Sequence, residues 1–261
     1  MKIKLGCDPE AFLKDVNGQL KSSIGKIGGS KMAPMPLPLG DGYCVQEDNV
    51  ALEFNIPPAE GRSSFVESIN KTLNFLTSLV GDMYGYTLSN SSAEYFPEEE
   101  LADPAAKEFG CDPDYNAWTK TRNPRPKATD ATLRSCGGHI HVGYEKDKID
   151  PTSVVKMMDL YLGVPSILMD QGEVRKQLYG GPGAYREKGY GVEYRTLSNF
   201  WIFQNRLIEW VWDNTSRAVA AAEQFTLSDE DGVSIVNAIK NNDKELATQL
   251  VKKFNLEVVH V

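Results

Sequence analysis

The stretch GGHIHVGYE, residues 137–145, decides how this sequence is best interpreted. It holds two of the three histidines in a chain of 261 residues, His139 and His141. In an extended strand, successive side chains point to opposite faces, so both histidines share one face while Ile140 and Val142 share the other. The sequence therefore predicts a β-strand with one apolar face and one polar face.

Three further stretches show the same alternation: VALEFNI at 50–56, GVEYRTL at 191–197, and the N-terminal segment around residues 3–10. Pro9 predicts that the N-terminal strand is an edge strand or carries a bulge, because proline cannot donate to a strand ladder. If these strands share one sheet, its polar face carries the following set: Glu10, Glu53, His139, His141, Glu193 and Arg195.

This polar face is unlike the solvated face of an ordinary antiparallel sheet. It carries carboxylates and histidines with hardly a lysine, and crowded carboxylates resist desolvation unless cations neutralise them. Carboxylate oxygens with one or two imidazole nitrogens suit Mg²⁺ or Mn²⁺ better than a structural zinc ion. The pattern therefore predicts a metal-binding sheet face.

Helical spacing of apolar residues predicts helices at 63–80, about 152–170, about 205–223 and from about 229 onward. Pro165 should bend or interrupt the second helix, and Ser228 is a good N-cap for the last. The Gly- and Pro-rich segment 25–42 predicts a long irregular loop. We expect an α+β fold in one domain, 1–261, with helices on the apolar face of the sheet and a helical C-terminal part from about residue 203.

Composition excludes several classes of function. The net charge is −8 and the pI about 5.1, which gives no electrostatic case for binding nucleic acid or an anionic membrane. No apolar run has the roughly 20 residues of a membrane helix, and the N-terminus lacks a signal-peptide core. The four cysteines lack metal-site or disulfide spacing, which predicts reduced thiols. We expect a cytoplasmic protein.

One alternative is a cupin-like mononuclear metal enzyme. His139, His141 and Glu145 fit the spacing H-x-H-x-x-x-E. A cupin also needs a third histidine on a later strand, and the only other histidine is His260, next to the C-terminus. The long helices between the strands also fit poorly with a small jelly roll.

Four motifs in combination resemble a known family: GCDPE at 6–10, QEDNVALEFN at 46–55, GGHIHVG at 137–143 and GVEYRTLSNFW at 191–201. In this order they resemble the carboxylate–amine ligases of glutamine synthetase fold, in particular the branch found in phages and called COOH–NH2 ligase type 2. Glutamate–cysteine ligases are more distantly similar. The resemblance covers about residues 3–60 and 109–201.

The resemblance implies a curved antiparallel sheet with its catalytic residues on the concave face. It also implies an enzyme that uses ATP and Mg²⁺ or Mn²⁺ to phosphorylate a carboxylate, which an amine then converts into an amide. By the resemblance, the metal ligands would be Glu10, Glu53, Glu193, His139 and Glu47, with Glu53 also counted as catalytic. Arg195 would hold the transferring phosphoryl group, and His141 would contact phosphate or substrate.

Two basic segments offer further anion ligands. Arg175 and Arg186 lie in the Gly- and Tyr-rich stretch 175–191 and can meet a phosphate or a substrate carboxylate bidentately, or be incidental residues of an exposed loop. The cluster Lys120, Arg122, Arg125, Lys127 and Arg134 is either a flap that recruits an anion or a solvated loop.

Several features stay open at the level of sequence. The expected partners are a carboxylate of amino-acid or peptide type and an amine, neither identified. Glutamine synthetases place their active sites between subunits, so a homo-oligomer is compatible with the resemblance. If the chain is phage-encoded, its location would be the host cytoplasm.

Overall fold

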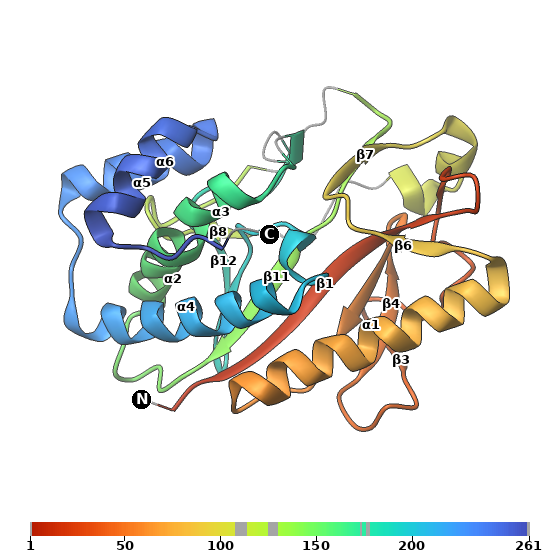
Figure 1. Cartoon of the computed structure of the whole chain (residues 1–261), viewed down its shortest axis with the longest axis horizontal. Helices are drawn as coiled ribbons and strands as arrows, with labels where there is room; N and C mark the ends of the chain where they lie inside the picture. Colours follow the sequence, from red (N-terminus) through yellow and green to blue (C-terminus); the bar gives the residue numbers. More distant parts are fainter. Residues whose placement is uncertain (1, 108–113, 125–129, 173, 176–177, 260–261) are drawn as a thin grey trace.

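A central β-strand, β1 (Lys4–Lys14), organises the computed structural model of the chain, which describes residues 2–107, 114–124, 130–172, 174–175 and 178–259. The main sheet is antiparallel and has the strand order β3 (Met35–Pro36), β4 (Cys44–Asp48), β5 (Ala51–Asn55), β1, β11 (Gly138–Gly143), β13 (Gly191–Tyr194), β12 (Ala184–Lys188), β8 (Tyr115–Asn116) and β9 (Thr121–Arg122) (Figure 1). Two short strands, β2 (Leu20–Lys21) and β6 (Thr87–Ser89), also pair with β1. A separate pair joins β7 (Ala93–Tyr95) to β10 (Leu133–Ser135).

The expectation that Pro9 marks an edge strand is wrong, because β1 is a central strand; the alternative, a bulge, stays a prediction. Residues 4–9 of β1 pair with β11, whereas residues 10–11 pair with β5 on the opposite side. On that second side the backbone N–H of Leu5 donates to the Ala59 carbonyl at 3.0 Å. Pro9 lies between this bridge and the β5 pairing, where β1 changes neighbours, so its missing N–H removes no ladder bond from the sheet.

The α+β class and the antiparallel sheet are confirmed, but the sheet is not curled. It is open, with β3 and β9 as the ends of its strand path. These two end strands have two residues each and are not paired with each other in the described part of the chain, so the sheet does not close on itself. The curved, concave form implied by the resemblance is therefore not adopted.

The predicted helices are present, with bounds close to those expected. They are α1 (Arg62–Tyr84), α2 (Pro151–Met158), α3 (Val164–Met169), α4 (Asn205–Gln224), α5 (Asp229–Asn241) and α6 (Lys244–Phe254). Ser228 caps α5, as expected, by accepting from the backbone N–H of Asp231. The predicted helix at 152–170 is interrupted by a π-helical segment, Asp159–Gly163, and Pro165 lies in the first turn of α3.

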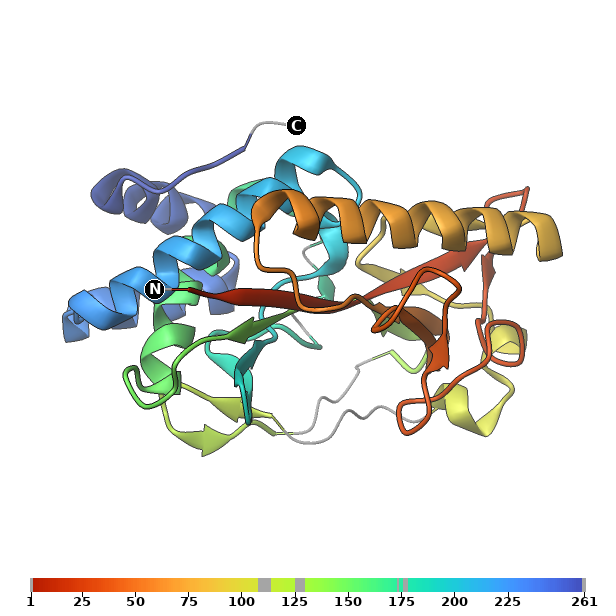
Figure 2. The same cartoon turned by 90° about the horizontal axis from the view of Figure 1, so that it is seen from below.

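Helices cover one face of the sheet, and the opposite face carries the polar side chains and a smaller apolar core. Figure 2 shows α1 and α4 on the same side of β1, with β8, β9 and the segment around 98–107 on the other side. Leu5, Ile140 and Val142 point toward the helices and join the main core with Phe65 and Ile69 of α1. A second, smaller core on the opposite face surrounds Phe12 and includes Phe96, Leu101, Ala106 and Cys136.

Within the part of the chain that is described, no helix combines the length and apolar character needed to cross a membrane. Cys7, Cys44 and Cys136 are free thiols, while Cys111 lies outside the described residues. The segment 25–42 is mainly irregular, with β3 and a single bridge between Ser30 and Ala33.

Candidate functional site

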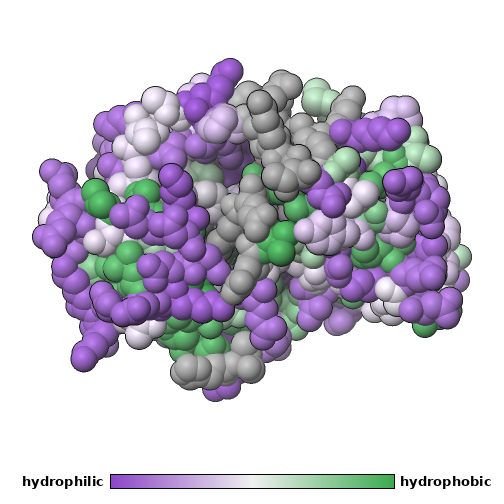
Figure 3. Space-filling model, turned by 90° about the horizontal axis from the view of Figure 1, so that it is seen from above, coloured by the Kyte–Doolittle hydropathy of each residue, from purple (hydrophilic) through white to green (hydrophobic). Residues whose placement is uncertain are grey.

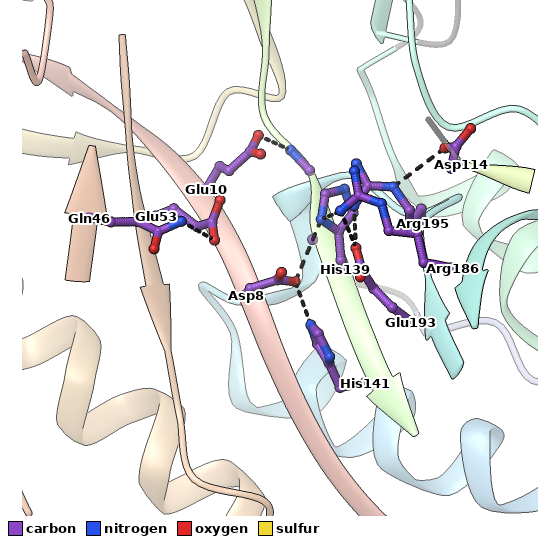
Figure 4. Close-up of polar contacts among 12 residues, drawn as sticks. Asp8, Glu10, Gln46, Glu53, Asp114, His139, His141, Arg186, Glu193 and Arg195 are labelled. Carbon is purple, nitrogen blue, oxygen red and sulfur yellow. Dashed lines mark hydrogen bonds and ion pairs between the residues drawn. The ribbon is translucent and has the colours of Figure 1, made fainter. Parts of the chain in front are cut away.

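Strand register brings the polar side chains together on the face opposite the helices (Figure 4). Asp8 of β1 stands opposite His139 of β11, His141 stands opposite Glu193 of β13, and Glu10 stands opposite Glu53 of β5. The shared face predicted from alternation therefore exists. Among the described residues, these side chains apart from His139, together with Asp48, form two groups of potential metal ligands.

The first group consists of Asp8, His141 and Glu193. One ligand atom from each lies within 4.8 Å of the other two. Asp8 Oδ1 is 3.1 Å from His141 Nε2 and 3.5 Å from His139 Nδ1. Sequence reasoning missed Asp8 as a ligand, although it precedes Glu10 by two residues and therefore shares its face.

The second group consists of Glu10, Asp48 and Glu53, whose carboxylate oxygens also lie within 4.8 Å of one another. Glu10 Oε2 accepts the backbone N–H of Gly137 at 2.7 Å, and Glu53 Oε1 accepts from Gln46 Nε2 at 2.8 Å. Asp48 was part of the quoted motif QEDNVALEFN but was not chosen as a ligand. It belongs to this face because it follows Gln46 by two residues on β4.

Burial and mutual repulsion perturb the carboxyls of the second group. Burial, and then the charge of Asp48, raises the pKa of Glu10 to about 8. Burial, and then the charges of Asp8 and Asp48, holds the pKa of Glu53 well above its usual value. A divalent cation among these oxygens would oppose both effects, because a nearby positive charge favours the ionised form.

Glu193 is buried but ionised, because cationic side chains surround it. Arg195 Nη1 donates to Glu193 Oε1, Arg186 Nη1 lies 3.2 Å from the same oxygen, and Lys188 Nζ lies 2.7 Å from Oε2. Burial and the charge of Asp8 act to raise the pKa of Glu193, but the positive groups, led by Arg195, lower it to about 2. Arg195 itself is buried and its Nε lies 3.4 Å from Asp114 Oδ2.

The two histidines have different environments. His139 Nδ1 lies 3.3 Å from Arg195 Nη1, and burial together with the charge of Arg195 lowers the His139 pKa. Burial opposes the charged form of His141 as well, but the carboxylate of Asp8 outweighs this and raises the His141 pKa. The same attraction lowers the pKa of Asp8 despite its burial. His141 thus completes the first ligand group, and His139 lies between Asp8 and Arg195.

Glu47 and Glu145 are not brought into this site. Glu47 stands opposite Leu52, and its Oε1 accepts the backbone N–H groups of residues 26, 27 and 28 at 3.1, 3.0 and 2.8 Å. Glu145 is exposed and pairs with Lys148. The cupin-like set of His139, His141 and Glu145 is therefore not assembled, and His260 lies outside the described residues.

The predicted basic residues have separate roles. Arg175 is buried, donates to the Thr196 carbonyl at 3.0 Å, and its charge acts on Glu10 to lower that carboxyl's pKa. Arg134 is also buried and donates to the carbonyl of Ala106, so it holds the 98–107 segment in place. Lys120 and Arg122 are exposed. Arg125 and Lys127 lie outside the described residues.

The polar residues on the outer surface are exposed to solvent, unlike the polar groups of the candidate site. Figure 3 shows one face of the molecule, which is mainly hydrophilic and carries scattered hydrophobic patches. The polar groups of the site, in contrast, are largely buried, with Glu10 8% and Glu53 7% exposed. Buried ionisable groups with perturbed pKa values concentrate at functional sites, which favours a chemical role for this cluster.

Comparison with known proteins bears on part of this site. A family model described as phage phiEco32-like COOH–NH2 ligase type 2 matches residues 129–260. The match includes His139, His141, Glu193 and Arg195, and it leaves β1, β4 and β5 outside. No curated protein matches the sequence.

Proposed function

This chain belongs to the phage phiEco32-like COOH–NH2 ligase type 2 family and is a carboxylate–amine ligase; we propose that it activates its carboxylate with ATP on the polar face of the sheet. The observation that carries the proposal is the pair of ligand groups on one face, next to a buried arginine. Enzymes that transfer phosphoryl groups commonly use carboxylates to bind divalent cations and an arginine to stabilise the group in transfer.

The donor atoms fit Mg²⁺ or Mn²⁺. Five carboxylates and one imidazole make up the two groups, and hard divalent cations prefer oxygen ligands. Asp8, His141 and Glu193 would hold one cation, with His139 beside them, and Glu10, Asp48 and Glu53 would hold another. When bound, the cations would neutralise the charge of the ATP phosphates. Glu47 is left out of the ligand set because it binds the backbone of residues 26–28.

We propose the following reaction sequence for this site. An oxygen of the substrate carboxylate attacks the γ-phosphorus, and the bond to the leaving ADP oxygen breaks. Arg195, assisted by Arg186 on the neighbouring strand, stabilises the phosphoryl group in transfer. The nitrogen of the amine attacks the carbonyl of the acyl phosphate, the bond to phosphate breaks, and the proton of the amine passes to a nearby carboxylate or phosphate oxygen.

Calorimetric titration with ATP, with and without Mg²⁺ or Mn²⁺, tests this proposal. We expect micromolar binding that requires the cation. A screen of amino-acid and peptide carboxylates with hydroxylamine as the amine should then yield hydroxamates in step with ADP. ATP binding that is the same with and without the cation, or no ADP with any carboxylate, would contradict the proposal.

A further inference from the structure

Asp159 is a fully buried carboxylate on the helical side of the sheet, away from both ligand groups. It opens the π-helical segment Asp159–Gly163 between α2 and α3. Such segments widen one helical turn and are frequent at functional sites. Burying a carboxylate is costly unless hydrogen bonds compensate it, so its partners indicate its purpose.

The first partners of Asp159 are residues on either side of Arg195. Tyr194 OH donates to Asp159 Oδ1 at 2.8 Å, and Thr196 Oγ1 lies 3.2 Å from the same oxygen. In a strand, the side chains on either side of Arg195 point to the face opposite that of Arg195. Asp159 therefore hydrogen-bonds to the strand on the face opposite the guanidinium. This fixes the backbone from which Arg195 projects.

The other oxygen of Asp159 fixes a second element, the hairpin that spans residues 114–123. Trp118 Nε1 donates to Asp159 Oδ2 at 2.6 Å. The same hairpin carries Asp114, whose Oδ2 lies 3.4 Å from Arg195 Nε, and Asn123 Nδ2 donates to Asp114 Oδ1 at 2.9 Å. One carboxylate therefore holds both the strand that bears Arg195 and the hairpin that bears its partner.

The glycine at the end of the π-helical segment supports this arrangement. A Cβ on Gly163 would lie 3.0 Å from Tyr194 OH and 3.5 Å from Asp159 Oδ1. The absence of a side chain there leaves room for the hydroxyl that Asp159 binds. The local sequence thus favours the contact between the helix and the strand.

We propose that Asp159 is a positioning residue for Arg195, which it orients through Tyr194 and Thr196 on the strand and through Trp118 on the hairpin. The proposal rests on the proposed function, because it assigns a purpose to the orientation of the arginine that assists phosphoryl transfer. Asp159 itself touches neither of the two ligand groups.

The first test follows the Arg195 guanidinium directly. In protein labelled with ¹⁵N-arginine, the Nε–H signal of Arg195 is assigned by its loss in Arg195→Lys. We expect Asp159→Asn to shift or broaden this signal, whereas Asn214→Ala leaves it unchanged. Asn214 is the matched control because it is also fully buried and hydrogen-bonded, but it lies in α4 and binds the Trp210 carbonyl and Glu257. An unchanged Arg195 signal in Asp159→Asn would overturn the proposal.

The second test is kinetic and uses the carboxylate found in the hydroxylamine screen. We expect Asp159→Asn to lower kcat about tenfold while the KM for ATP stays within about twofold, because orientation in transfer is lost and ground-state binding is kept. If Asp159→Asn and Asn214→Ala lowered kcat equally, the effect of Asp159 would be one of general stability, and the proposal would be overturned. If the wild type turns over no ATP but the Arg195 signal still shifts, the positioning stands and the proposed function fails.

Milder variants cover the case in which Asp159→Asn does not fold. Trp118→Phe removes the indole N–H that links Asp159 to the hairpin, and Tyr194→Phe removes only one link to the strand. Each should perturb the Arg195 signal in part. A signal that neither variant moves would contradict the proposal.

Discussion

At the scale of single residues, Glu193 is held ionised in a buried position by three cations. Replacing it with the isosteric, neutral Gln would remove a ligand from the first group and leave the buried Arg195 with less compensation. We expect Glu193→Gln to weaken Mn²⁺ binding at least tenfold and to lower the free energy of unfolding by about 3–5 kcal/mol, as is usual when one partner of a buried ion pair is lost. Electron paramagnetic resonance titration and urea unfolding measure the two effects.

Glu187→Gln is the matched control for this substitution. Glu187 lies on the neighbouring strand β12 and its side chain is 57% exposed, where it pairs with Lys146. Loss of an exposed pair costs at most about 1 kcal/mol and should leave the Mn²⁺ affinity unchanged. If both variants bound Mn²⁺ like the wild type, Glu193 would not be a ligand.

Asp159 gives the protein a pH dependence with a defined sign. Burial raises the pKa of Asp159 to about 6, although its hydrogen bonds oppose this. Between its unfolded pKa near 4 and about 6, the folded state holds a proton that the unfolded state has released, so this contribution to stability is complete below pH 4 and is lost as the pH rises through 6. We expect that, from pH 4 to pH 7, the free energy of unfolding of the wild type falls by up to about 3 kcal/mol relative to that of Asp159→Asn. Urea unfolding at the two pH values measures this difference. If the difference in unfolding free energy between wild type and Asp159→Asn were the same at both pH values, this prediction would be contradicted.

At the scale of elements, the two glycines of GGHIHVG are explained by what surrounds them. A Cβ on Gly138 would collide with the Ser198 carbonyl oxygen and the indole nitrogen of Trp201, and one on Gly137 would collide with the His139 ring. Backbone atoms cannot move aside cheaply, so we expect Gly138→Ala to lower the free energy of unfolding by about 3 kcal/mol. Gly189→Ala should be nearly neutral in the same urea titration, because no atom of the described residues, apart from the adjacent residues of the chain, lies within 4 Å of the added Cβ. Similar losses in both would contradict this explanation.

The Glu47 side chain fastens the 25–42 loop to strand β4. Its Oε1 accepts three backbone N–H groups, and an ionised acceptor forms stronger bonds than a neutral one. Glu47→Gln should therefore lower the free energy of unfolding by about 1–2 kcal/mol and leave Mn²⁺ affinity unchanged. Glu53→Gln, on the neighbouring strand, is the comparison and should weaken Mn²⁺ binding. Weaker binding in Glu47→Gln would restore Glu47 as a ligand.

Which side chains of one strand share a face of the sheet could be predicted from the sequence. Which face a residue on the next strand occupies depends on the register across the turn, and this could not be predicted. Period two correctly places His139 and His141 on one face, because both lie in the same strand. The resemblance implies a ligand at Glu47, but Glu47 pairs with Leu52 across the β4–β5 turn, so its side chain shares the face of Leu52 and not that of Glu53. The role of Asp159 depends on a contact between distant elements, for which the sequence holds no local signal.

At the scale of the whole molecule, the two ligand groups concentrate five of the 36 acidic residues of a chain whose net charge is −8. Ions that bind only the folded state stabilise it by about 2.7 kcal/mol per site at a hundredfold excess over Kd. For a chain of this size we expect Mg²⁺ or Mn²⁺ at that excess to raise Tm by about 5–10 °C. NaCl of equal ionic strength should give a smaller change, because screening acts weakly on buried charges.

The variant Glu10→Gln tests whether Mg²⁺ or Mn²⁺ raises Tm by binding at the second ligand group or by a general effect of ionic charge. Without divalent ions the variant should be at least as stable as the wild type, because it removes a buried carboxyl whose pKa is raised by burial and by Asp48 while an amide oxygen can still accept the Gly137 N–H. With Mg²⁺ or Mn²⁺ its gain in Tm should be smaller than that of the wild type, since the second group has lost a ligand. The two stability curves should therefore cross as the metal concentration rises. Parallel curves, measured by thermal unfolding across a metal series, would show that the ions do not bind at Glu10.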